Sequence, residues 1–146
     1  MPEESHYLIH TDGGARGNPG PAAIGVVIEG PEMSKKEYGE YIGHTTNNVA
    51  EYSAVIFALK KLKLLIGSSK SAQATVAVHT DSELLVKQLN GEYKVKEPAM
   101  QDLFIQIWNM RLDFKKVTFQ HIPREKNHGA DRMVNYTLDQ EQDKLI

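Results

Sequence analysis

The sequence contains no cysteine, which excludes disulfide bonds and metal sites built from thiolates. It also lacks any apolar run near the roughly 20 residues that a membrane-spanning helix needs. Its first ten residues, MPEESHYLIH, begin with acidic side chains and have neither the basic start nor the long apolar stretch of a signal peptide. These absences favour a cytoplasmic protein without membrane contact.

An excess of positive charge is missing as well. The 146 residues include 17 Lys and Arg against 19 Asp and Glu, which gives a net charge of −2. This balance argues against a protein that coats nucleic acid through bulk charge, because such domains are usually basic. Lysines are nevertheless grouped at 60–63, 93–96 and 115–116, so a local basic face remains open.

What the chain does contain is ordinary for a globular protein, with 40% hydrophobic and 25% charged residues. Its length is enough for a single buried core, so we expect one domain over residues 1–146.

The hydrophobic pattern changes from strand to helix along the chain. It predicts strands at 6–11, 22–30, 35–43, 74–80 and 117–122, and helices at 47–67, 82–90, from Pro98 onward and around 130–138. The order β-β-β-α-β-α-α-β-α predicts an α/β fold in which helices cover a mixed sheet.

Two of these helices carry more detailed expectations. Asn47 or Asn48 is expected to cap the start of the 47–67 helix, and Gly67 to end it. In the helix after Pro98, inward-facing positions are predicted at Leu103, Ile107, Met110 and Trp108.

Four carboxylates stand where predicted elements begin or end: Asp12, Glu51, Asp81 and Asp131. If the 74–80 strand lies parallel to the first strand, the four gather at one end of the sheet, where sites in α/β folds form. Clustered carboxylates repel one another unless cations lie between them, and such oxygen ligands suit Mg²⁺ or Mn²⁺. Taken singly, each acid is also explained by helix-dipole stabilisation or by a turn.

The glycine-rich segment DGGARGNPG, residues 12–20, fits none of the common phosphate or calcium loops. It departs from G-x-G-x-x-G, has no Gly-Lys-Ser/Thr and does not match the calcium-binding loop. It also joins two predicted strands, so it offers no helix N-terminus to a phosphate. What glycine does allow is close approach of the backbone to another backbone or to a substrate.

Four segments, spread over residues 8–138, resemble the motifs of the ribonuclease H type 1 family in their order. They are TDGGARGNPGPAAIG (11–25), TTNNVAEYSAV (45–55), TDSELLVKQL (80–89) and PREKNHGADRMVN (123–135). The resemblance implies a five-stranded mixed sheet, three strands antiparallel and two parallel, flanked by helices. It implies a metal-dependent endoribonuclease, a hydrolase that cuts the RNA strand of RNA–DNA hybrids and leaves 5′-phosphate and 3′-hydroxyl ends.

Carried over residue by residue, the family's acidic positions fall on Asp12, Glu51, Asp81 and Asp131. The resemblance implies that these acids hold two Mg²⁺ or Mn²⁺ ions, with Asp12 bridging them. One ion then activates the attacking water and the other stabilises the departing 3′ oxygen.

The resemblance also implies contacts with the hybrid. The implied substrate-binding residues are Gly13, Gly14, Asn18, Thr46, Asn47, Asn48 and Ser82. Backbone at the glycines can approach RNA 2′-hydroxyls, and neutral amides and hydroxyls read sugar and phosphate without sequence preference. The same side chains also suit turns and helix caps.

The chain departs from the best-known bacterial members at three places. Glu83 stands where those members have glutamine, and the 91–101 segment is short where they have a long basic protrusion. The third place is the PRE loop, typical of a branch that uses arginine instead of a mobile histidine. We therefore favour Arg124 over His121 as the group that assists product release, with His128 as a third candidate.

Two other functions stay open from the sequence. One is a catalytically silent module that binds hybrids on the same fold, and the other is a related two-metal enzyme such as a resolvase or transposase core. No protein partner is evident, so we expect a monomer whose partner is the RNA–DNA hybrid.

Overall fold

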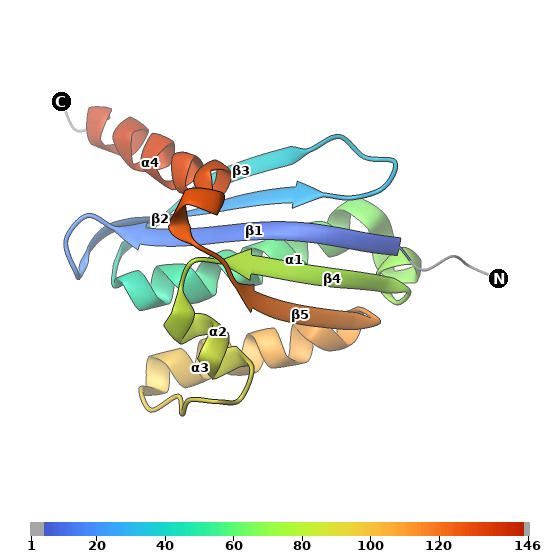
Figure 1. Ribbon diagram of the computed structural model, residues 1–146. Coiled ribbons are helices and arrows are strands. Elements are labelled where there is room, and N and C mark those ends of the chain that lie inside the picture. Colours follow the sequence, from blue (N-terminus) through green and yellow to red (C-terminus); the bar gives the residue numbers. More distant parts are fainter. Residues whose placement is uncertain (1–4, 145–146) are drawn as a thin grey trace.

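The computed structural model describes residues 5–144 and places five strands in one sheet, in the order β3-β2-β1-β4-β5 (Figure 1). The elements are β1 (Ser5–Ala15), β2 (Gly20–Glu29), β3 (Lys36–Thr45), α1 (Asn47–Ser71), β4 (Ala74–Thr80), α2 (Glu83–Leu89), α3 (Pro98–Met110), β5 (Lys116–His121) and α4 (His128–Asp143), with short 3₁₀ turns at Arg111–Asp113 and Arg124–Lys126.

The sheet has the predicted mixture of strand directions. β1, β2 and β3 are antiparallel neighbours, whereas β4 pairs parallel with β1 and β5 parallel with β4. The predicted element order and mixed sheet are therefore confirmed. None of the helices within residues 5–144 is long and apolar enough to cross a membrane.

The main core lies between the sheet and α1. Alternate residues of the central strands are fully buried on this face, among them Ile9, Val76 and Val78. An apolar stripe of α1 supplies the other side, with buried residues Tyr52, Val55, Ile56, Leu59 and Leu62. α4 packs against β1, β2 and β3 on the opposite face.

β1 is longer than the sequence pattern suggests. It runs to Ala15 and pairs with β2 from Leu8↔Glu29 to Ala15↔Ala22. Asp12 and both following glycines therefore lie within a strand, and the turn is confined to residues 16–19. Glycine hides the strand from a pattern reading because it has no side chain to alternate.

The start and end of α1 also differ from expectation. Its cap is Thr46, whose hydroxyl accepts a hydrogen bond from the Val49 amide at 3.3 Å, and neither Asn47 nor Asn48 plays this part. Gly67 has a φ of 84°, which interrupts the helix, but helical structure resumes and continues to Ser71.

Trp108 was expected to face inward, but it is 44% exposed. Its ring stacks on Phe104, and the Arg111 guanidinium lies 3.2 Å from its ring centre. These contacts pack the indole against other side chains at the surface, outside the core. Ile107 on the same helix is buried as predicted.

Gly13 lets α1 approach the sheet closely. A Cβ added at Gly13 would lie 2.2 Å from the Ala50 carbonyl carbon and 2.5 Å from the Glu51 nitrogen. Backbone atoms cannot yield to such a contact, so only glycine fits here. A Cβ at the next residue, Gly14, would meet only Val134 at an ordinary 3.5 Å.

These two glycines make a matched pair of variants. Gly13→Ala should lower the free energy of unfolding by at least about 2 kcal/mol, because it forces α1 away from the sheet. Gly14→Ala should change it by far less. Urea denaturation of both variants measures the difference, and equal stability of the two would contradict this account of the packing.

Candidate active site

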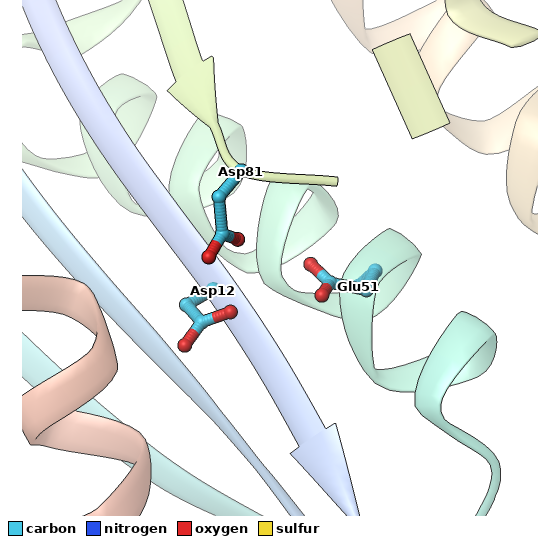
Figure 2. Close-up of side chains that lie close together, drawn as sticks. All are labelled: Asp12, Glu51 and Asp81. Carbon is cyan, nitrogen blue, oxygen red and sulfur yellow. The ribbon is translucent and has the colours of Figure 1, made fainter. Parts of the chain in front are cut away.

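Two of the four acids are placed by the ends of neighbouring strands. Thr11 of β1 pairs with Thr80, the last residue of β4. The next residue on each chain segment is an aspartate, Asp12 on β1 and Asp81 directly after β4 (Figure 2). β1 continues past this point, so both carboxylates stand at an opening beside a central strand.

The third acid comes from α1. Glu51 projects from the second turn of the helix toward Asp12 and Asp81, as Figure 2 shows. One carboxylate oxygen from each of the three lies within 4.8 Å of the others. The close approach of α1 at Gly13 makes this possible. The Gly13 amide also partly counteracts the rise in the pKa values of the Asp12 and Glu51 carboxyls.

Asp131, in the first turn of α4, adds a fourth acid next to Asp12. It lies close enough for a side-chain hydrogen bond with Asp12. Its Oδ1 is 3.8 Å from a guanidinium nitrogen of Arg124. Asp131 therefore adds a carboxylate from α4 beside Asp12, with the Arg124 guanidinium next to it.

Burial and mutual repulsion disfavour ionisation of this cluster. Burial, followed by the charges of Asp81 and Asp131, raises the pKa of Asp12 from 3.8 to about 8. Burial and the charge of Asp12 raise the pKa of Glu51 well above its ordinary value. The buried Oε2 of Glu51 has no hydrogen-bond partner among residues 5–144. Oxygen ligands, excess negative charge and an unpartnered buried oxygen fit a hard divalent cation.

The acids line a cavity of about 530 Å³ at the end of the sheet. Its wall also contains Gly13, Gly14, Asn47 and Arg124. Among the predicted site residues, the ones that do not line it are Asn18, Thr46, Asn48, Ser82 and His121. Asn48 lines a separate groove with Lys94 and Lys96.

Several predicted substrate residues also hold the backbone together. Asn18 accepts a hydrogen bond from the Asn47 amide at 3.1 Å, and the Asn47 side chain accepts one from the Ala15 amide at 2.8 Å. These bonds join the β1–β2 turn to the start of α1. Thr46 and Ser82 cap α1 and α2 with their hydroxyls.

The three candidates for product release lie in different surroundings. His121 is the last residue of β5, pairs with Thr80 and is exposed. Arg124 lies in the following turn and lines the cavity of the acids. His128 begins α4 and lines a neighbouring shallow hollow with Arg124 and Asp131. Glu83, at the position expected for glutamine, forms an ion pair with Lys87 at 3.0 Å.

Sequence reasoning missed Asn127, which is 1% exposed. Its side-chain amide donates a 2.9 Å hydrogen bond to the carbonyl of Thr11, the residue before Asp12. Its backbone bonds to Arg124 and Asp131 at 2.9 and 3.1 Å. Asn127 thus fixes the loop and α4 against β1, a role that no local pattern reveals.

The role of Arg16 is not visible in a local sequence pattern either. Its guanidinium forms a 2.6 Å ion pair with Asp139 and reaches the carbonyl of Asn135, both on α4. These contacts tie the β1–β2 turn to α4 across the cavity. The partner residues are more than a hundred positions away along the chain.

Comparison with known proteins agrees with this geometry. Residues 10–137 match the model of the reverse transcriptase-like family. The chain is 37% identical over 134 residues to a bifunctional protein of Mycobacterium tuberculosis and 35% identical over 129 residues to ribonuclease HI of Halobacterium salinarum. These matches cover 90% and 88% of this chain, but only 35% and 62% of the two relatives.

Solved structures extend the comparison to the whole fold. LC11-RNase H1, solved in complex with an RNA/DNA hybrid, is 47% identical with a TM-score of 0.85, and the match covers 93% of this chain and 99% of that one. The Halobacterium salinarum RNase H1 structure has a TM-score of 0.84 at 32% identity, with 92% and 98% covered. The chain therefore belongs to the reverse transcriptase-like family and forms a ribonuclease H-like domain.

Proposed function

We propose that this protein is a metal-dependent endoribonuclease that cleaves the RNA strand of RNA–DNA hybrids and leaves 5′-phosphate and 3′-hydroxyl ends. The observation that carries the proposal is the group of three carboxylates within 4.8 Å of one another in an open cavity. The similarity to a ribonuclease H1 that binds an RNA/DNA hybrid supports it.

Asp12, Glu51, Asp81 and Asp131 would hold two divalent ions, Mg²⁺ or Mn²⁺. When bound, such ions supply a water activated for attack and stabilisation of charge on the leaving oxygen. Asp12 is central among the acids and is the proposed bridging ligand. All four come from one chain, and we propose that this single domain acts as a monomer.

The remaining groups of the site would hold the hybrid. Backbone at Gly13 and Gly14 lines the cavity beside Asp12, where it can accept the RNA strand. We assign further contacts to the side chains of Asn18, Thr46, Asn47, Asn48 and Ser82. Arg124 faces the cavity with a permanently charged guanidinium, which suits contact with a phosphate.

A silent binding module on the same fold is the alternative. The acid cluster speaks against it, because carboxylates with raised pKa values reduce stability when they ionise. A module that bound no cation would lose this stability with no bound ion to offset the loss.

The cleavage proposal is tested with one labelled sequence as RNA–DNA hybrid, double-stranded RNA and double-stranded DNA, with and without Mg²⁺ or Mn²⁺. We expect metal-dependent loss of the RNA strand of the hybrid alone. Asp12→Asn should abolish the activity, while Asp102→Asn, an exposed acid on α3, should retain it. Binding without cleavage would support the silent module, and cleavage of DNA would support a resolvase-like or transposase-like enzyme.

The same variant tests the electrostatics of the cluster in EDTA. In the folded protein the pKa of Asp12 is raised from 3.8 to about 8, so the carboxylate lowers stability as the pH rises through this interval. Asp12→Asn should therefore melt about 3 °C or more above the wild type near neutral pH, since 1 kcal/mol shifts Tm by roughly 2–4 °C at this size.

The difference in Tm between Asp12→Asn and the wild type should shrink toward about pH 4, where the wild-type carboxyl becomes protonated in the unfolded as well as the folded protein. Thermal melting followed by circular dichroism at both pH values measures it. A variant that melts below the wild type at neutral pH would refute the proposed repulsion.

The choice between Arg124 and His121 is tested by their alanine variants at saturating Mn²⁺. Arg124→Ala should lower kcat at least about tenfold, because an oriented charge beside the reacting phosphate is lost. His121→Ala should have a much smaller effect, since this histidine lies outside the cavity wall. A larger loss in His121→Ala than in Arg124→Ala would reverse the assignment.

A further inference from the structure

Two histidines lie side by side on the sheet face opposite α1. His10 of β1 and His79 of β4 are direct partners in the parallel register. Their neighbours Ile9 and Val78 are buried toward α1, so both imidazoles point to the other face. Both histidines are half-buried.

The distance between the two rings matches that of two imidazoles bound to one metal ion. Their centroids are 5.3 Å apart and their planes cross at 77°. With Zn–N bonds of about 2.0–2.1 Å and tetrahedral angles, two imidazoles on one ion have centroids about 5 Å apart. The backbone pairing sets this spacing, because neighbouring strands of a sheet lie about 4.8 Å apart.

We propose that His10 and His79 form a second metal site, which takes a borderline transition metal such as Zn²⁺, Ni²⁺ or Cu²⁺. Imidazole nitrogen prefers these ions, whereas carboxylate oxygen prefers Mg²⁺ and Mn²⁺. The site is therefore chemically distinct from the acid cluster. Two protein ligands leave the other coordination positions to water.

The site lies immediately before the acid cluster along both strands. His10 precedes Asp12 by two residues and His79 precedes Asp81 by two, which is about 7 Å along a strand. An ion held by both imidazoles would join β1 to β4 directly ahead of the two aspartates. The proposal concerns binding only and does not depend on the cleavage activity.

Titration calorimetry with Zn²⁺ tests the site, at a pH about one unit above the ordinary imidazole pKa and with Mg²⁺ in excess to occupy the acids. We expect one Zn²⁺ per chain. His10→Gln and His79→Gln should each weaken binding at least about tenfold, since even outer-shell losses cost 10–100-fold. His6→Gln, an exposed histidine on the same face of β1, should bind as the wild type does.

Asp12→Asn is the control for Zn²⁺ binding at the acid cluster. This variant should bind Zn²⁺ at His10 and His79 as the wild type does. Loss of binding in Asp12→Asn, unchanged affinity in either His10→Gln or His79→Gln, or no binding by the wild type would each overturn the proposal. Circular dichroism confirms that each variant is folded. As a second readout, Zn²⁺ should raise the Tm of the wild type but not that of either site variant.

Discussion

The repulsion among the buried carboxylates is the constraint on which the site depends. Without a bound cation, Asp12 and Glu51 resist ionisation, as their raised pKa values indicate. The fold holds them together nonetheless, because each is fixed by backbone packing. Gly13 lets α1 bring Glu51 against β1, and Asn127 ties the start of α4 to the carbonyl before Asp12. The cost of this arrangement is offset when a cation binds.

The same packing explains why the cavity is open to a large substrate. β4 ends at Thr80 while β1 continues to Ala15, so the acids stand beside a strand that has lost one neighbour. Arg16 and Asn47 then hold the β1–β2 turn to α4 and α1 on either side. The result is a cavity rim braced on both sides with carboxylates at its base, and such an open cavity fits the proposed nucleic-acid substrate better than a small enclosed ligand.

Element order and the position of the acids could be predicted from the sequence because both follow local patterns. The apolar stripe of α1 and the aspartates after apolar runs are visible within short windows. The length of β1 could not be predicted, since Gly13 and Gly14 carry no alternating side chains. Asn127 and the His10–His79 pair depend on contacts between distant segments. Thr46 caps α1 although the two asparagines that follow it have a higher N-cap propensity, so propensity alone pointed to the wrong residue.

Anomalous scattering at the manganese edge tests the central claim most directly. Crystals of the protein grown with an RNA–DNA hybrid and Mn²⁺ should show manganese among the carboxylates of Asp12, Glu51 and Asp81. Hybrid cleavage by the same preparation in Mn²⁺, without manganese at these carboxylates in the crystal, would contradict the account.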